Sequence, residues 1–203
     1  MTKRILSALR RCRVCAASIF ITYLISALVG ILMSHNGVEF ALSQRDKIVG
    51  AAVNNDKASI NYQSGNNFTA AIFDFSGNLF YAAIPQTVMG LGVVLPFVSV
   101  SYQGWVGGIV SVDNAHHTRF KNFKSTFYYF FVMFLQFLPF SLSIGAGVEC
   151  GLEAYKYNSQ ISWKLWQFRI PKESLMNVGY VYLVSIPLFF IASCYEFLSP
   201  WNL

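Results

Sequence analysis

Long apolar stretches alternate with shorter polar ones along this chain of 203 residues. Apolar residues dominate positions 17–34, 68–84, 86–112, 126–155 and 176–198. A helix of about 20 such residues crosses a bilayer. The pattern therefore predicts an all-α, polytopic membrane protein with about five transmembrane helices, folded as one integral membrane domain over 1–203.

Polar stretches precede and connect the predicted helices. Positions 1–16 form a basic N-terminus, 35–67 an outer polar loop, 113–125 a charged loop and 156–175 a basic amphipathic segment. Within the outer loop, the weakly amphipathic part 38–53 predicts a helix that lies in the membrane interface. The Asn- and Gly-rich remainder of that loop predicts irregular structure.

The composition agrees with a membrane-embedded chain. Hydrophobic residues make up 55% of the sequence and charged residues 12%, about half the roughly 25% charged residues of soluble domains. A soluble catalytic domain is therefore not expected. The net charge of +6 is spread over the segments between apolar stretches rather than gathered on one face, so nucleic acid is not an expected partner.

The basic N-terminus predicts the orientation in the membrane. Positions 1–16 contain five Lys and Arg residues and no acid, which predicts that this end lies on the cytoplasmic side of the membrane. A cleaved signal peptide is the alternative, but the following apolar stretch is longer than usual and lacks a clear cleavage site.

The topology of the middle of the chain stays open. Five full crossings place 9 Lys and Arg residues inside and 6 outside. If 68–112 and 126–155 contain re-entrant parts, the distribution becomes 12 inside and 3 outside. Charge thus favours some re-entrance, whereas segment length favours five crossings.

Three prolines are expected to interrupt the helices. Pro85 should join the second and third crossings in a tight hairpin, Pro139 should break the fourth, and Pro187 should kink the fifth.

Polar residues inside the apolar stretches are the candidate functional residues. Asp74, Asn78 and Tyr81 follow at spacings of four and three, which predicts one shared helix face. A carboxylate at that depth is costly in lipid, so the face should point to protein or water. Glu149 and Glu153 share a second face; they either relay protons or bind a cation, or form a solvated pair beside a lysine, which is the preferred interpretation.

Small residues at helical spacing predict close helix packing. One small-residue stripe runs through the third predicted helix and another through the fourth, and a neighbouring helix should lie along each. The packing residues are Gly90, Ser101, Gly104, Gly108, Ser111, Ser143, Gly147 and Gly151.

No cofactor, metal or catalytic residue is predicted. Cys12 and Cys15 form a C-x-x-C pair, but a second pair of zinc ligands at suitable spacing is missing from the sequence. Palmitoylation is a further alternative, and ordinary small residues beside the membrane are preferred. His116 and His117 are expected in a solvated loop rather than at a metal.

The order of features resembles the stage II sporulation protein M family over nearly the whole chain. The resemblance rests on four segments: Phe73-Asp74-Phe75-Ser76-Gly77-Asn78, Met89-Gly90-Leu91-Gly92, Gln103-Gly104-Trp105-Val106-Gly107, and Leu138-Pro139 with the Gly-rich run after it. It implies a multi-span scaffold or permease-like subunit that works with partner proteins in a prokaryotic cytoplasmic (inner) membrane.

Two functions are therefore expected. The preferred one is a non-enzymatic membrane subunit, a scaffold or permease-like component of a homo-oligomer or of a complex with other membrane proteins, such as an ATPase. The alternative is a transporter or channel subunit that moves a small solute, ion or peptide with a separate energising partner, with Asp74 and Asn78 on its polar path.

Overall fold

A computed structural model describes residues 1–159 and 169–199, and within them the chain is helical, as the all-α prediction requires. Outside the helices these residues form turns, short loops and one isolated antiparallel bridge between Val112 and Thr118. The elements in chain order are α1 (Thr2–His35), α2 (Glu39–Asn55), α3 (Lys57–Gln63), α4 (Asn67–Ser76), the π-helix η1 (Gly77–Ala83), α5 (Ile84–Met89), the 3₁₀-helix η2 (Gly90–Gly92), α6 (Leu95–Ile109), α7 (Phe123–Ser159) and α8 (Lys172–Leu198).

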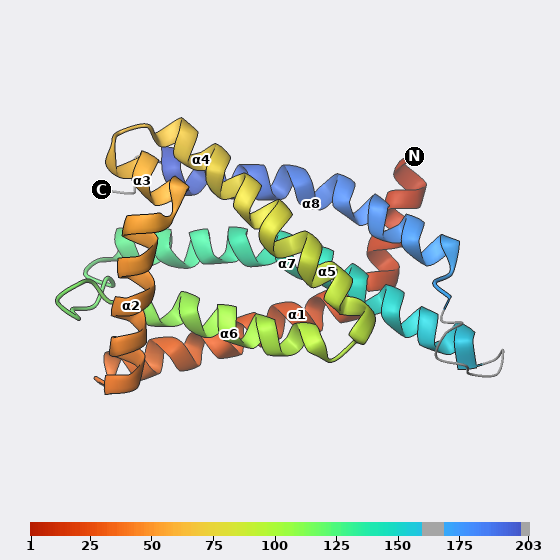
Figure 1. Ribbon diagram of the computed structural model, residues 1–203, viewed down its shortest axis with the longest axis horizontal. Helices are drawn as coiled ribbons and strands as arrows, with labels where there is room; N and C mark the ends of the chain where they lie inside the picture. Colours follow the sequence, from red (N-terminus) through yellow and green to blue (C-terminus); the bar gives the residue numbers. More distant parts are fainter. Residues whose placement is uncertain (160–168, 200–203) are drawn as a thin grey trace.

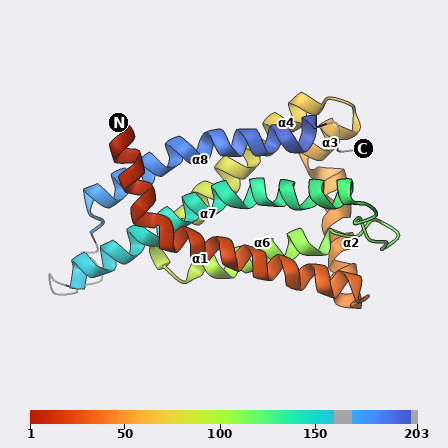
Figure 2. The same cartoon turned by 180° about the vertical axis from the view of Figure 1, so that it is seen from behind.

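Five helical passes make up a bundle, and α2 lies across one end of it. The first pass is α1, and the second is the continuous helical run formed by α4, η1 and α5. The other three are α6, α7 and α8, and the passes extend along the long axis in both views (Figures 1 and 2). Three of the described helices, α1, α7 and α8, are long and apolar enough to cross a membrane. The ends of α1 and α6 and the start of α7 lie at the α2 end.

The bundle core is apolar and centres on α1 and α7. Ile19, Ile144 and Phe189 are fully buried there. The ring of Tyr23 stacks on Phe137 with centroids 4.4 Å apart. Its hydroxyl donates a 2.6 Å hydrogen bond to Gln103 Oε1, which satisfies both polar groups within the bundle.

A neighbouring helix was predicted to lie along the first small-residue stripe, and the structure shows that this helix is α1. A Cβ added at Gly104 would lie 2.7 Å from the carbonyl oxygen of Tyr23, and one at Gly108 would be still closer to that of Ala27. Ser111, at the end of the stripe, bonds to Ser34 Oγ at 3.3 Å. Backbone contact of this kind requires residues without a side chain.

The second stripe packs against α5 and η2. Gly147 lies against the backbone of Thr87, and Gly151 against Gly90 and Leu91. Gly90 in turn faces Gly147. The two stripes thus mark internal contacts of this chain.

The hairpin that was predicted at Pro85 lies further along the chain. Pro85 lies where the π-helix η1 passes directly into α5, and such a local π-helical adjustment lets a membrane helix continue through a proline. The chain reverses instead between η2 and α6, where Val93 has a φ of 57°. The prediction of separate helices over 68–84 and 86–112 is therefore wrong in its boundary.

Pro139 and Pro187 lie inside unbroken helices, so the predicted break of the fourth helix and a re-entrant hairpin there are wrong. Serine hydroxyls bond to carbonyl groups around Pro139. Ser141 Oγ donates to Phe137 O at 2.6 Å and Ser143 Oγ to Pro139 O at 2.9 Å. Neither bond reaches the Leu135 carbonyl that Pro139 leaves without an N–H partner, but Pro139 is buried in the bundle, and packing against neighbouring helices lets a helix continue past a proline.

The outer segment is more helical than predicted. The interfacial helix is present as α2, but the expected irregular part contains α3, which begins where Asp56 Oδ2 accepts a 2.8 Å bond from the Ser59 N–H. This is an N-terminal cap, which favours helix formation. The basic segment 1–16 is also helical, because Ala8 and Cys12 pack against α7 and α8.

The two remaining connecting segments differ in what the structure describes. The charged loop 113–125 is irregular up to the start of α7, as predicted. Much of the basic amphipathic segment 156–175, including Trp163, Lys164 and Trp166, lies outside the described residues.

Candidate functional site

Asp74 and Asn78 meet as their spacing predicts, whereas Tyr81 lies apart. The Asn78 amide donates to Asp74 Oδ2 at 2.9 Å. Tyr81 is 86% exposed, so the prediction that it shares their face is wrong. The cause is the π-helix Gly77–Ala83, whose wider turn rotates the following residues out of register; such segments occur often at functional sites.

Three residues from α7 and α8 complete the group around Asp74, and we call these five residues the carboxylate network. Ser193 Oγ donates to Asp74 Oδ2 at 2.6 Å. The Gln136 amide nitrogen, Nε2, donates to Glu196 Oε2 at 2.7 Å and to Asp74 Oδ2 at 3.4 Å. Both distances are measured from one nitrogen, so the two carboxylate oxygens lie within about 6 Å of each other, where like charges interact strongly.

Sequence reasoning missed Gln136, Ser193 and Glu196. A signal was present for two of them. Gln136 is the single amide in the aromatic run of α7, and Glu196 is the only acid of α8 beyond its first turn. An isolated polar residue in an apolar helix often marks a functional position, but only the fold shows that these helices bring the two residues to Asp74.

Neutral donors surround Asp74. Its Oδ2 atom accepts from a serine hydroxyl and from the amide groups of Asn78 and Gln136. The Gln136 carbonyl oxygen in turn accepts from the Asn78 amide at 3.3 Å. The two amides therefore present N–H groups, and not carbonyl oxygens, to the carboxylates.

An open cavity of about 690 Å³ adjoins the carboxylate network at the α2 end of the bundle. Gln136 and Glu196 line it, and Arg119 of the charged loop contributes a cationic group. Most of the remaining wall is aromatic or aliphatic. These wall residues include Tyr62, Tyr128, Tyr129, Val132, Met133, Phe137 and Phe197.

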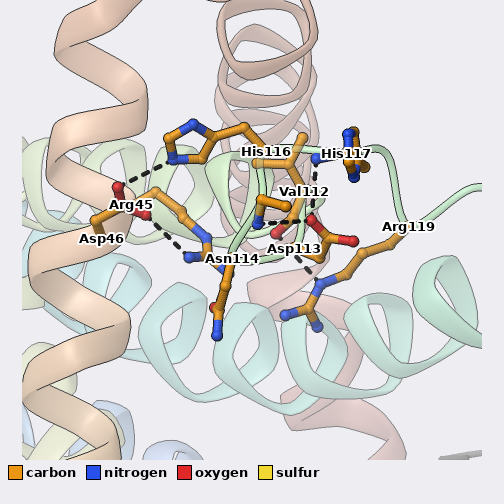
Figure 3. Close-up of polar contacts among 9 residues, drawn as sticks. Arg45, Asp46, Val112, Asp113, Asn114, His116, His117 and Arg119 are labelled. Carbon is orange, nitrogen blue, oxygen red and sulfur yellow. Dashed lines mark hydrogen bonds and ion pairs between the residues drawn. The ribbon is translucent and has the colours of Figure 1, made fainter.

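A second polar cluster joins α2 to the loop between α6 and α7 (Figure 3). Arg45 is buried although it is charged. Its guanidinium donates to Asp46 Oδ1 at 2.9 Å and to Asn114 Oδ1 at 2.8 Å. Asp46 Oδ2 is 3.0 Å from His116 Nε2. These contacts, which we call the α2 latch, hold α2 across the bundle end.

Hydrogen bonds lower the pKa values of two carboxyl groups in this region. The guanidinium of Arg45, and then the His116 ring, hold the pKa of Asp46 below its ordinary value. The backbone N–H of His117, which bonds to Asp113 Oδ1 at 3.0 Å, lowers the pKa of Asp113. Both groups therefore stay anionic at neutral pH, which favours these hydrogen bonds.

Glu149 and Glu153 are separate from the carboxylate network. Glu149 Oε2 accepts a 3.5 Å bond from Cys15 Sγ, and Glu153 lies 3.9 Å from the Lys156 ammonium. Glu149 follows Gln136 by 13 residues of one helix, about 20 Å along its axis. The ion pair with lysine fits the interpretation of Glu153 as part of a solvated pair.

The cysteines are free thiols, and three of the four are buried. Within residues 1–159 and 169–199, no group of three or more His, Cys, Asp or Glu side chains is arranged to hold a metal ion.

Comparison of the chain with protein-family models, with curated proteins and with solved structures finds no match. The resemblance to the stage II sporulation protein M family stays a prediction.

Proposed function

We propose that this chain is a permease-like subunit of a membrane complex, and that it couples the movement of a small solute to a proton shared by Asp74 and Glu196. The observation that carries the proposal is the Gln136 amide, which bridges the two carboxylates at 3.4 and 2.7 Å. A bridged pair of this kind fits transport better than pure scaffolding. Ionisable groups inside membrane helices are costly, so they occur mainly where they have a function.

A proton is the ion that fits this pair. Two carboxylates so close in a medium of low dielectric constant repel each other strongly when both are ionised. One bound proton removes that repulsion. A metal cation would need several oxygen ligands, but the Asn78 and Gln136 amides offer N–H groups at this point.

The membrane arrangement belongs to the same proposal. We take the N-terminus as cytoplasmic, which puts the α2 end and the cavity on the outer side. All five passes then lie in the bilayer. The 15 residues of α6 span only about 22 Å, less than the roughly 30 Å of hydrocarbon, so we place the hairpin of α5 and α6 as entering from outside without reaching the cytoplasmic surface.

The scaffold function is the second candidate, and the small-residue stripes no longer support it. Gly104 and Gly108 contact α1 of the same chain, so they are not available to a partner. Large apolar side chains remain exposed on α1 and α8, such as Ile25, Leu32 and Leu183. These faces fit lipid, a second copy of the chain or an energising partner such as an ATPase.

A flux assay tests the proposal. Purified protein is reconstituted in vesicles that enclose a pH-sensitive dye, a pH gradient is imposed, and a short apolar peptide is added as the solute. We expect wild-type protein to dissipate the gradient and Asp74→Asn to lose this activity, because the amide keeps the hydrogen-bonding shape but cannot hold the proton. Glu153→Gln is the matched control, since Glu153 pairs with Lys156 outside the network.

Two results would overturn the proposal. One is a flux of Asp74→Asn vesicles equal to that of wild type. The other is a loss of flux in Glu153→Gln as large as in Asp74→Asn, which would point to general damage and not to the carboxylate network.

A further inference from the structure

The open cavity at the α2 end of the bundle has the build of a ligand site. Its volume of about 690 Å³ falls within the roughly 300–1,000 Å³ of small-molecule pockets. Its wall is mostly apolar and aromatic, with few polar groups, which is the usual composition of such pockets. The segments that line it come from α2, α3, α6, α7, α8 and the charged loop, so the whole bundle end shapes it.

Two tyrosines contribute mainly their rings to this cavity, because their hydroxyl groups are used within the bundle. Tyr128 donates to a backbone carbonyl oxygen of α8 at 2.8 Å, and Tyr129 donates to the backbone carbonyl oxygen of Gly107 on α6. Phe137 and Phe197 add two further rings to the wall. Aromatic rings pack favourably against one another in stacked or edge-to-face arrangements. The wall therefore favours a ligand with an aromatic body.

Other polar side chains of the wall are bound within the chain. Ser59 Oγ donates to the Asp56 carboxylate at 2.9 Å. Glu196 belongs to the carboxylate network, where it accepts a 2.7 Å bond from Gln136. These groups have partners inside the fold, so the charge of the ligand has to be argued from another residue.

Arg119 is that residue. Its Nε–H donates to the carbonyl oxygen of Val112 at 3.3 Å, which fixes the guanidinium just beyond the end of α6. In the described part of the chain its terminal nitrogens donate no further hydrogen bond, and Figure 3 shows them extended beyond the loop toward the neighbouring helix. The cavity wall thus contains a cationic group whose terminal N–H groups are available to a ligand.

We infer that the cavity binds a carboxylate on an aromatic body, of the class of aryl carboxylates and short aromatic peptides with a free carboxyl end. The carboxylate accepts paired hydrogen bonds from Arg119, whose planar guanidinium matches its shape. The body lies against the rings of the wall. A neutral or cationic ligand would leave the guanidinium without an anion, and a polar body would leave the aromatic wall without a matching surface.

This inference names the solute of the proposed function and rests on that function for its coupling to the proton. Gln136 lines the cavity and also belongs to the carboxylate network. An anion bound in the cavity adds negative charge beside the network, which favours the shared proton. By reciprocity the proton favours the anion equally. The two should therefore move together in the same direction.

Direct binding in detergent tests the inference without any flux. The probe is N-acetyl-phenylalanyl-phenylalanine, an anion with two rings, and its C-terminal amide is a neutral analogue of nearly equal size. We expect the amide to bind wild-type protein about tenfold more weakly or worse, because hydrogen bonds between charged groups are roughly twice as strong as neutral ones. Dodecanoate, a carboxylate on an acyl chain, should also bind more weakly than the probe, because it has no ring to stack.

Two variants of the charged loop separate the role of Arg119 from that of general positive charge. Arg119→Gln should bind the probe and its amide equally. Lys121→Gln is the matched control, because Lys121 carries the same charge on the same loop and pairs with Asp113 at 3.7 Å outside the residues that line the cavity. It should keep the preference for the carboxylate. The comparison of probe and amide on wild-type protein remains decisive if a variant fails to fold.

The inference is overturned if the probe does not bind, if its amide binds wild-type protein as well, or if Lys121→Gln loses the preference as Arg119→Gln does. Tighter binding of dodecanoate than of the probe would also overturn it, since the cavity would then be a site for lipid acyl chains. Failure of the proposed function looks different. In that case the probe binds with the expected preferences, while Asp74→Asn leaves proton flux unchanged.

Discussion

Replacement of Gly108 by alanine should separate two helices. The Cβ atom that this change adds would sit on the carbonyl oxygen of Ala27 and 2.8 Å from the Ile31 nitrogen, where ordinary contacts between such atoms are about 3.5 Å or more. The atoms in the way are backbone atoms of α1, so no side chain can rotate to make room. α1 and α6 must move apart by more than about 1 Å.

The cost follows from overpacking. Extra methyl groups in a tight core cost about 1–3 kcal/mol, and a backbone clash belongs at the upper end, near 3 kcal/mol. For a chain of this size, 1 kcal/mol shifts Tm by about 2–4 °C, so the Tm of Gly108→Ala should lie about 6–12 °C below that of a variant that gains the same methyl group without the clash. Thermal unfolding in detergent measures it.

Gly107→Ala is the matched control. It places the same methyl group one residue away, where the nearest atom, Phe137 Cζ, is 3.4 Å distant. Both variants gain the same helix propensity of about 1 kcal/mol, so the difference between them reports only the helix contact. Equal Tm values for the two variants would refute the close packing of α6 on α1.

Three further changes have defined outcomes. Tyr23→Phe removes the donor to Gln103 Oε1 and should cost about 1–2 kcal/mol in thermal unfolding, whereas Tyr102→Phe, at an exposed position, should cost nothing measurable. Gly90→Ala should lower Tm, since its Cβ would lie 2.5 Å from Gly147 C; an unchanged Tm would count against the packing of η2 on α7. The α2 latch should weaken in acid: because the folded pKa of Asp46 lies below its ordinary 3.8, its contribution is present above that value and is lost as pH falls through the folded pKa. Hydrogen exchange of α2 should show this loss in wild-type protein and not in Asp46→Asn.

Local spacing predicted part of the candidate site. A separation of four residues brings Asp74 to Asn78 in any helix, so this contact follows from sequence alone. The same reasoning was wrong for Tyr81, because the π-helix changes the number of residues per turn and nothing in the sequence predicted it. Gln136 and Glu196 reach Asp74 only through the packing of α4, α7 and α8, which a single sequence does not specify.

The sequence likewise predicted part of the fold, namely the helices and the positions of close packing, but not which helices pack together. Apolar length predicted the helices, and small residues predicted where two backbones touch. The partners of Gly104 and Gly147 required the structure. The effects of Pro85 and Pro139 were predicted wrongly because the effect of a proline depends on the local helix type and on the surrounding packing. Pro85 follows a π-helical segment, and Pro139 is buried in the bundle.

Infrared spectroscopy of the carboxyl groups in reconstituted protein tests the shared proton most directly. Wild-type protein should show the C=O band of a protonated carboxyl group at neutral pH, and the band should vanish as pH rises. In Asp74→Asn and in Glu196→Gln the band should vanish at lower pH, because the remaining carboxylate has no like charge beside it. No such band in wild-type protein at neutral pH, or loss of the band at the same pH in all three proteins, would contradict the account.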